Sequence, residues 1–324
     1  MSDAIKKVLA PHALEVKDVK HYQLESILQQ AKDAPAVATA VVHPVDANSL
    51  QGALEAAEAK IILPFLVGPE KKIRAVAEEH QLDLKDYPII DTEHSHEAAE
   101  IAVEMARKGE VHALMKGKLG TAELLGAVVF KNGGLRTERR LSHVFVMDVP
   151  SYHKSLFISD AAINISPSLM DKRDILQNAI DCAHALNVDL PKIAVLSAVE
   201  KVKPNIQSTL DAAALCKMMD RGQLTGGLID GPLAFDNAIS REAADDKGIN
   251  SPVPGDVDIL LAPDLESANM FAKQLQYLAN AKAAGIVMGA RVPIILTSRA
   301  AKSLERLSSC AVAVMVARKM GRLE

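Results

Sequence analysis

Short apolar runs alternate with Ala- and Leu-rich stretches of helical spacing along the N-terminal third of the chain. Residues 37–42 and 61–67 are typical of buried strands, and residues 48–60 and 70–81 are typical of the helices that follow them. Such alternation predicts a parallel sheet with helices on its faces. We therefore expect an α/β protein.

The same alternation of strands and helices continues to the end of the chain. The segment before the first strand is expected to be rich in helix. Further strands are predicted near residues 87–90, 112–115, 144–147, 155–158, 192–197, 227–230, 259–262 and 292–297. Helices are predicted at residues 96–108, 172–186 and 209–220, and an amphipathic helix and the apolar run 311–317 follow the last strand. No repeat, linker or low-complexity segment marks a domain boundary.

Length and composition limit the fold further. A chain of 324 residues exceeds the size at which a single core usually stops growing, so two domains are expected. With 6 Phe, 4 Tyr and no Trp, the core must be built from Ala, Val, Ile and Leu. Those residues suit buried parallel strands covered by Ala-rich helices.

Charge and apolar patterning exclude several classes of protein. A net charge of −4 provides no global basic field to hold nucleic acid or an anionic membrane. No apolar run reaches membrane-spanning length, and no secretory signal precedes the first strand. The 3 cysteines lack CxxC spacing, which favours a reducing compartment, so a cytoplasmic protein is expected.

The clearest chemical signal is the run Val-Pro-Ile-Ile-Leu-Thr-Ser-Arg at 292–299, where a buried strand ends at a hydroxyl and a guanidinium. Ligands of open α/β sheets lie beyond the carboxyl ends of strands. Ser298 could cap a helix whose N-terminus binds an anion, and Arg299 could donate to phosphate oxygens. The alternative is a plain helix cap followed by a solvated arginine.

Glu305 follows Ser298 by seven residues, which is two helical turns and about 10 Å along a helix. Its carboxylate would lean back toward Ser298, so the two groups could bracket a substrate. A surface ion pair with Lys302 or Arg306 explains Glu305 equally well.

Two basic segments are weaker candidates for an anion site. Lys-Gly-Lys-Leu-Gly-Thr at 116–121 could wrap backbone N–H groups around a phosphate, although it does not match the Walker pattern. Arg136, Arg139 and Arg140 form a second basic cluster. A solvated turn and a solvated charged face are the simpler interpretations.

The remaining reactive side chains have structural explanations. His94, His96 and His143 lack an HExxH motif or a Cys/His pairing, so no metal site is predicted. Cys310 could be imagined as an acyl acceptor, but its apolar neighbours favour a packed core thiol.

Several long stretches resemble the phosphate acetyltransferase and phosphate butyryltransferase family. They are Asp-Ala-Ala-Ile-Asn-Ile (160–165), Gly-Pro-Leu-Ala-Phe-Asp-Asn-Ala-Ile-Ser (231–240), Asp-Ile-Leu-Leu-Ala-Pro-Asp-Leu-Glu-Ser-Ala-Asn-Met (258–270) and Ala-Gly-Ile-Val-Met-Gly-Ala-Arg-Val-Pro-Ile-Ile-Leu-Thr-Ser-Arg (284–299). They occur in the family's order. The middle of the chain is also similar to the transferase part of enoyl-CoA hydratase fusions.

The resemblance implies a two-domain, three-layer fold similar to the isocitrate and isopropylmalate dehydrogenases, with a cleft between the domains. Residues 1–141 and 293–324 would form domain one, and residues 142–292 would form domain two. The resemblance also implies a homodimer.

The resemblance assigns site residues position by position. Ser298 and Arg299 match the family's Ser-Arg pair, and Glu305 falls where acetyltransferases carry an aspartate. Ser142 and Asn164 match a serine and an asparagine of the family. Acetyltransferases place an arginine where this chain has Gly126, so one phosphate contact falls to Arg136 or Lys116, with Thr121 nearby.

The implied reaction transfers an acyl group, acetyl or butyryl, between coenzyme A and inorganic phosphate within a ternary complex. Acyl-CoA and phosphate are then substrates, and the chemistry needs no metal or redox cofactor. Two alternatives stay open: an NAD(P)-dependent hydroxy-acid dehydrogenase of the same fold, and a non-catalytic protein that binds coenzyme A or acyl phosphate.

Overall fold

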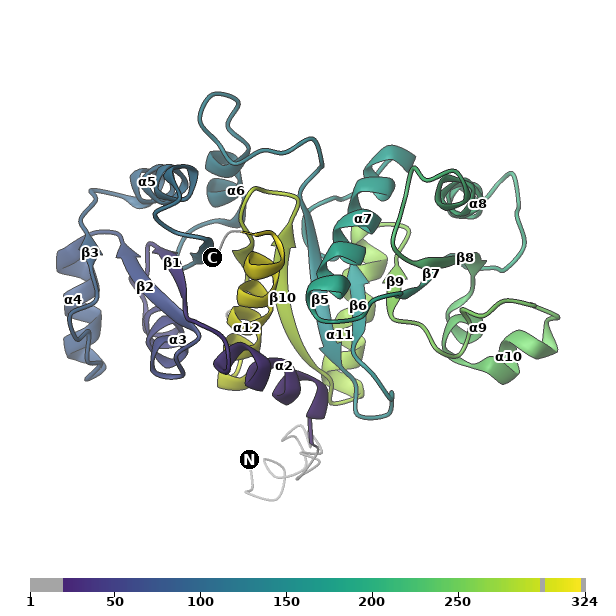
Figure 1. The fold of residues 1–324 in the computed structure, drawn as a ribbon, viewed down its shortest axis with the longest axis horizontal. Coiled ribbons are helices and arrows are strands. Elements are labelled where there is room, and N and C mark those ends of the chain that lie inside the picture. The colour runs from purple at the N-terminus through teal and green to yellow at the C-terminus, as the bar shows by residue number, and fades with distance from the viewer. Residues whose placement is uncertain (1–19, 298–300, 322–324) are drawn as a thin grey trace, which may run out of the picture.

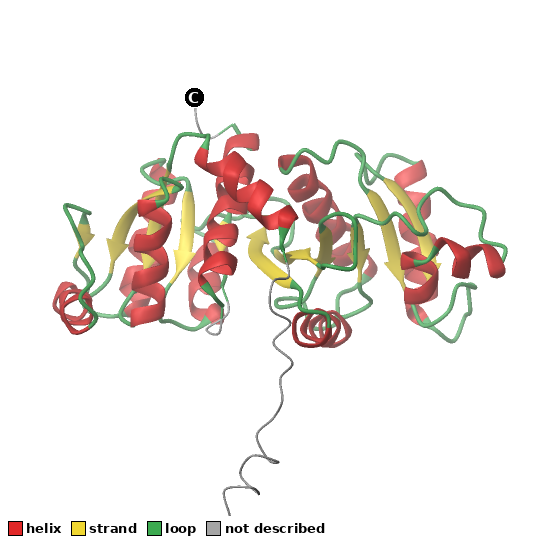
Figure 2. Ribbon diagram, turned by 90° about the horizontal axis from the view of Figure 1, so that it is seen from below, coloured by secondary structure: helices red, strands yellow, loops and turns green. Residues whose placement is uncertain are grey.

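All strands of the described chain belong to a single mixed sheet with helices on both faces (Figures 1 and 2). The computed structural model describes residues 20–297 and 301–321. Over these residues the sheet has 11 strands in the order β3-β2-β1-β4-β11-β10-β5-β6-β9-β7-β8. The predicted α/β class is confirmed.

The strands match most of the predicted positions. They are β1 (Val37–Val42), β2 (Ile62–Val67), β3 (Ile89–Ile90), β4 (Ala113–Lys116), β5 (Ser142–Asp148), β6 (Leu156–Ser159), β7 (Lys192–Leu196), β8 (Leu228–Leu233), β9 (Ile259–Leu261), β10 (Lys282–Met288) and β11 (Ile294–Ile295).

The helices connect the strands and cover them. They are α2 (Tyr22–Lys32), α3 (Ala47–Glu58), α4 (Glu70–Glu79), α5 (Ser95–Lys108), α6 (Thr121–Val129), α7 (Leu169–Ala185), α8 (Gln207–Asp220), α9 (Phe235–Ile239), α10 (Arg241–Asp246), α11 (Leu265–Leu278) and α12 (Ser303–Lys319).

The expectation of a parallel sheet is wrong at its centre. Strands β3, β2, β1, β4 and β11 are mutually parallel, as are β6, β9, β7 and β8. Between these groups, β10 is antiparallel to β11 and to β5, and β5 is antiparallel to β6. The two parallel groups therefore run in opposite directions, and their carboxyl ends lie at opposite edges of the sheet.

Strand β10 was not predicted from the sequence. It begins Lys-Ala-Ala-Gly, and these residues have low strand propensity, so the local pattern does not indicate a strand. Tertiary context decides the conformation, because β10 is paired along both edges and almost entirely buried.

Three apolar clusters form the core. One face of the sheet packs against α2, α3, α4, α7, α8 and α12. On the other face, α5 and α6 contribute to a second cluster, and α9 and α11 contribute to a third. As the composition predicts, alanines supply much of the buried helical surface.

Helix α12 is the central helix of the first cluster. The predicted amphipathic helix and apolar run are one continuous helix, which contacts α2, α3, α7 and β10. Cys310 is fully buried in it, and burial raises the pKa of its thiol to about 12. Its burial in the first cluster confirms the predicted packed core thiol. A thiol with that pKa is protonated at neutral pH.

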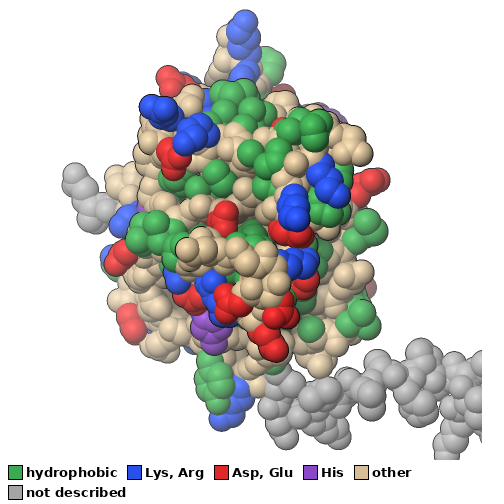
Figure 3. All heavy atoms as spheres, turned by 90° about the vertical axis from the view of Figure 1, so that its right-hand side faces the viewer, with side chains coloured by type: hydrophobic (Ala, Val, Ile, Leu, Met, Phe, Trp, Pro, Cys, Tyr) green, Lys and Arg blue, Asp and Glu red, His purple; other side chains and the backbone are tan. Residues whose placement is uncertain are grey.

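The end of the molecule formed by β8, α8, α9 and α10 carries Lys, Arg, Asp and Glu side chains intermixed with apolar ones (Figure 3). No large patch of one charge gathers on this face. Within the described residues, no helix combines the length and the apolar character needed to span a bilayer.

Candidate active site at the carboxyl ends of β1, β4 and β11

The order of strands changes direction between β1 and β4. The chain passes from β1 outward to β2 and β3, and then returns to form β4 on the opposite side of β1. In open α/β sheets, ligands bind outside the carboxyl ends of the strands at such a switch point. Because β11 is parallel to β4 and beside it, the carboxyl ends of three strands meet here.

A pocket of about 310 Å³ lies at this edge of the sheet. Its lining comes from the segments at or after all three strand ends: Asp46, Asn48, Ser49, Lys116, Gly117, Lys118, Leu119, Thr297, Ala301 and Arg306. The volume is at the lower end of the range of small-molecule sites, about 300–1,000 Å³.

Larger hollows lie elsewhere, but their position or charge suits an anion less well. One of about 600 Å³ between α5 and α6 is lined by Glu100, Glu104 and Glu123, which would repel an anionic substrate. Another of about 520 Å³ lies beside α7 and the C-terminal end of α12, away from the switch point.

The N-terminus of α3 forms one wall of the pocket. Asp46 caps this helix, and its carboxylate accepts a hydrogen bond of 3.0 Å from the backbone N–H of Ser49. Asn48 and Ser49, in the first turn, also line the pocket. The positive end of a helix favours a bound anion, but here the Asp46 carboxylate already accepts the Ser49 N–H and adds a negative charge to the wall.

The β1 and β4 loops approach each other through their backbones. The N–H of Gly117 donates to the carbonyl of Val42 at 2.9 Å, and the N–H of Lys118 donates to the carbonyl of His43 at 2.9 Å. A Cβ atom at Gly117 would lie 2.4 Å from the Val42 oxygen, so only glycine fits. This contact fixes Lys116 and Lys118 at the pocket.

Of three basic-segment residues predicted for the site, only Lys116 lines this pocket. Lys116 ends β4, lines the pocket, and its Nζ donates to the carbonyl of Gly117 at 3.3 Å. Thr121 is the first residue of α6 and is half-buried, outside the pocket lining. Arg136 is exposed and forms an isolated bridge with Ala290, away from the pocket.

Ser298 and Arg299 lie outside the described residues. Thr297 and Ala301, on either side of residues 298–300, both line the pocket. The two ends of this segment are therefore placed at the edge where the sequence predicted chemistry.

Glu305 is buried in the first turn of α12, where its side chain completes a capping box with the N-cap residue Lys302. One carboxylate oxygen accepts from the N–H of Lys302 at 3.1 Å, and the other accepts from the N–H of Ala283 at 3.3 Å and from Gln276 Nε2 at 3.2 Å. It lines a separate hollow of about 130 Å³. The alternative of an ion pair with Arg306 is wrong, because Arg306 binds Glu55.

A family model described as Phosphate acetyl/butaryl transferase matches residues 94–314. The chain is 57% identical to the phosphate acetyltransferase of Rickettsia prowazekii over 301 residues, which covers 93% of this chain and 85% of the relative. It is 42% identical to the phosphate butyryltransferase of Clostridium beijerinckii, covering 90% and 97% of the two chains.

The solved structures agree with these matches. A branched-chain phosphotransacylase from Enterococcus faecalis superposes with a TM-score of 0.75 at 26% identity, covering 87% of this chain and 99% of that one. The chain belongs to the phosphate acetyl/butyryltransferase family. The resemblance drawn from the sequence is confirmed, and membership makes the chain an acyltransferase.

Two residues that the family resemblance assigned to the site lie elsewhere. Ser142 begins β5 and faces Met288, the last residue of β10. Because β10 and β11 are antiparallel, this position lies at the edge of the sheet opposite the pocket. Asn164 follows β6 at the same opposite edge and donates to the carbonyl of Leu141 at 2.8 Å. The described structure does not bring either residue to Lys116.

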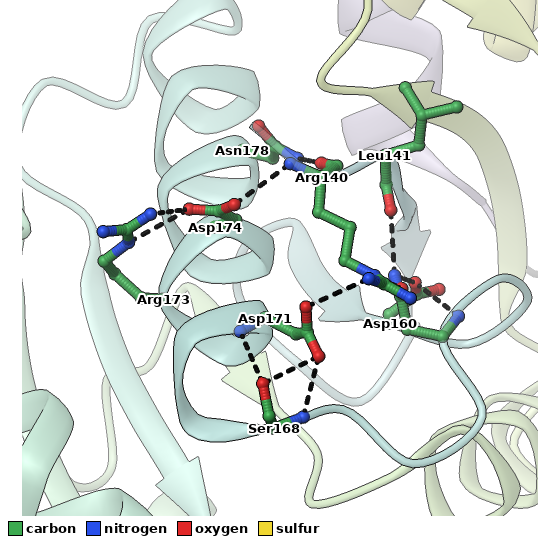
Figure 4. A network of polar contacts seen from close by, with 9 residues as sticks. Arg140, Leu141, Asp160, Ser168, Asp171, Arg173, Asp174 and Asn178 are labelled. Atoms are coloured by element: carbon green, nitrogen blue, oxygen red, sulfur yellow. Dashed lines mark hydrogen bonds and ion pairs between the residues drawn. The ribbon is translucent and has the colours of Figure 1, made fainter. Parts of the chain in front are cut away.

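Figure 4 shows a polar network around Arg140 that includes Asp171 and Asn178. Ser142 and Asn164 also belong to it. Asn178 of α7 donates to Ser142 Oγ and to the carbonyl of Arg140, each at 2.9 Å. Arg140 also donates through its Nε to Asn164 Oδ1, and its Nη1 lies 3.2 Å from an Asp171 oxygen. The network joins the loop before β5 to α7 in this acyltransferase.

The three histidines for which no metal site was predicted are a helix cap, an exposed side chain and a buried side chain. His94 caps α5 by accepting from the N–H of Glu97 at 3.1 Å, and His96 is exposed beside Glu123. Burial lowers the pKa of His143 to about 4, against the opposing effect of Asp160 and with help from Lys273, so its imidazole is neutral at pH 7. Among residues 20–297 and 301–321, no three His, Cys, Asp or Glu side chains are placed to hold a metal ion.

Four residues that line the pocket were not predicted from the sequence: Asp46, Asn48, Ser49 and Arg306. The capping pattern Asp46-x-x-Ser49 is visible in the sequence, but Asp264-x-x-Ser267 at the start of α11 has the same pattern. Only the strand order shows which helix N-terminus lies at the switch point.

Proposed function

We propose that this chain transfers an acyl group between coenzyme A and inorganic phosphate, and that acetyl is the preferred group. The observation that carries the proposal is the pocket at the switch point, which combines the N-terminus of α3 with Lys116 and Lys118. Identity of 57% to a phosphate acetyltransferase, against 42% to a phosphate butyryltransferase, supports acetyl.

Phosphate would bind where these positive groups converge. Two ammonium groups and a helix N-terminus attract an anion, and a guanidinium from Arg299 would add a planar fork of donors that matches phosphate oxygens. Such donors hold the nucleophile beside the thioester, which lowers the entropic cost of bringing two substrates together.

The transfer would proceed directly within a ternary complex. A phosphate oxygen attacks the thioester carbonyl carbon, and the carbonyl oxygen becomes an oxyanion. The carbon–sulfur bond then breaks, and acyl phosphate and the coenzyme A thiolate leave. The Ser298 hydroxyl would donate a hydrogen bond to the oxyanion or to the leaving sulfur. This chemistry needs neither a metal nor a redox cofactor.

In the reverse direction the thiol must lose its proton, because the thiolate is the nucleophile. We retain Glu305 as the proposed base. Its carboxylate accepts the backbone N–H groups of Lys302 and Ala283, which fixes its position at the start of α12.

A thiol-release assay tests the proposed function. Acetyl-CoA and butyryl-CoA are each incubated with the protein, with and without phosphate, and free thiol is measured. We expect phosphate-dependent release that is faster with acetyl-CoA. Absence of release from both thioesters, or release that does not depend on phosphate, would contradict the proposed reaction.

We further propose a two-domain division, with residues 1–141 and 293–324 in domain one and residues 142–292 in domain two. The separation of the α5/α6 cluster from the α9/α11 cluster on one face of the sheet supports it. A cytoplasmic location is proposed with it, since the free cysteines Cys182, Cys216 and Cys310 suit a reducing compartment.

A homodimer is proposed through α11. Met270, Tyr277 and Leu278 of this helix are 60%, 76% and 81% exposed, and their spacing of seven and eight residues places them on one face. A self-complementary contact between two such faces would bury them. We expect the wild type to sediment as a dimer and Leu278→Glu to sediment as a monomer. A monomeric wild type, or an unchanged Leu278→Glu variant, would argue against this interface.

A further inference from the structure

Glu55 and Arg306 join α3 to the beginning of α12 beside the pocket. The Arg306 guanidinium donates to both Glu55 carboxylate oxygens, at 2.9 and 3.1 Å. Ser303, the first residue of α12, donates from its hydroxyl to the same carboxylate at 3.0 Å. Glu55 therefore holds two residues of the first turn of α12 at once.

Arg306 also holds the segment that leads into α12. Its Nη1 donates to the carbonyl of Ala301 at 2.8 Å. Ala301 is the first described residue after positions 298–300, and it lines the pocket together with Arg306 and Thr297. One guanidinium thus connects α3 to the C-terminal side of the predicted Ser298-Arg299 segment.

Helix α3 is shaped to admit this guanidinium. Gly52 lies one turn before Glu55, in the interior of α3, where glycine weakens a helix. A Cβ atom at this position would lie 2.9 Å from Arg306 Cδ and 3.2 Å from Arg306 Nε. The absence of a side chain at Gly52 is therefore what lets Arg306 lie against α3 and reach Glu55.

The pair is not arranged as a fully satisfied ion pair. The Arg306 side chain is 12% exposed, and its Nε is buried without a hydrogen-bond partner among the described residues. Burying a charge with an unused donor opposes folding, so stability alone does not account for the arrangement. Its contacts are instead directed at Glu55 of α3 and at the Ala301 carbonyl in the pocket wall.

We propose that Glu55 and Arg306 are a positioning pair for the acyl transfer, fixing the Ala301 carbonyl and the first turn of α12 against α3 at the pocket wall. This inference rests on the proposed function. Neither residue needs to touch a substrate, because both act through the backbone at Ala301 and the first turn of α12. Misplacing a reactive group by about 1 Å can lower a rate by about 100-fold.

The experiment measures kcat, both KM values and the unfolding temperature of Glu55→Gln, Arg306→Ala and Arg306→Lys. We expect kcat to fall by about 10–100-fold in Glu55→Gln and Arg306→Ala, with both KM values within about threefold of the wild type. The kcat of Arg306→Lys should lie between those of these two variants and that of the wild type, because an ammonium keeps the charge but cannot reproduce the planar fork of the guanidinium. All assays are run well below every unfolding temperature.

Two further variants separate positioning from a general structural effect. The exposed pair Glu70–Arg74 on α4 is a matched control, and Arg74→Ala should leave kcat unchanged. Gly52→Ala removes no charge but displaces the guanidinium, so as a single variant it should lower kcat. In the double variant with Arg306→Ala it should lower kcat little further.

The outcomes are distinguishable. Three results would each overturn the positioning role. They are a wild-type kcat in Arg306→Ala, a raised phosphate KM with unchanged kcat in that variant, and additive losses of kcat in the double variant of Gly52→Ala with Arg306→Ala. A wild-type chain that releases no thiol would overturn the proposed function itself, and the role of the pair with it.

Discussion

Replacing Arg299 with alanine is expected to lower kcat for phosphate-dependent thiol release by about 100–1,000-fold and to raise the KM for phosphate. The guanidinium is the proposed bidentate ligand of phosphate, and its charge would stabilise the negative charge that develops as phosphate attacks. Its loss should therefore weaken both the binding of phosphate and the stabilisation of the transition state. Initial rates over a matrix of phosphate and acetyl-CoA concentrations measure the two effects separately.

Arg291→Ala provides the matched control. Arg291 is an exposed arginine that precedes β11, and it is not among the residues that line the pocket. Its replacement should leave both kinetic constants at wild-type values. Equal kinetics in Arg299→Ala and the wild type would show that the phosphate site lies elsewhere.

Removing Asp211 is expected to lower the free energy of unfolding by about 3–5 kcal/mol. Asp211 of α8 accepts from Lys172 Nζ of α7 at 2.6 Å, and the two side chains are 7% and 6% exposed. Asp211→Ala would leave the Lys172 ammonium buried without its charge partner. Urea denaturation followed by far-ultraviolet circular dichroism measures the loss.

A double variant identifies the origin of that loss. Lys172→Met combined with Asp211→Leu should recover most of the stability, because apolar residues of similar volume often replace a buried ion pair at little cost. The exposed pair Lys217–Asp220 at the end of α8 is the control, and Lys217→Ala should leave the denaturation midpoint unchanged. A midpoint equally unchanged in Asp211→Ala would mean that water reaches Lys172 in solution.

Periodicity predicted most of the fold because most strands are short apolar runs between turn signals. The predicted strand at 37–42 coincides with β1, and the prediction at 61–67 begins one residue before β2. The same criterion failed for β10, where Ala283, Ala284 and Gly285 give no strand signal. Its conformation comes from pairing with β5 and β11, which no local window contains.

The site was partly predictable for a related reason. Lys116 was identified because a basic, glycine-rich segment follows a predicted strand, and the structure places it at the switch point. Arg306 could not be recognised, because its partner Glu55 lies 251 positions earlier. Ser142 and Asn164 lie at the opposite edge of the sheet from Lys116, because the strand direction reverses at β10 and β5, and local sequence does not reveal that reversal.

That reversal also governs the electrostatics of the molecule. Helix α3 follows a strand of the first parallel group, whereas α7 and α8 follow strands of the second group, so the macrodipoles of these helices point in opposite directions. Their long-range fields partly cancel, so an anion at either edge of the sheet is attracted mainly by the groups close to it. Recruitment of a charged substrate should depend on the few groups at its own rim, and only weakly on the charge of the distant half.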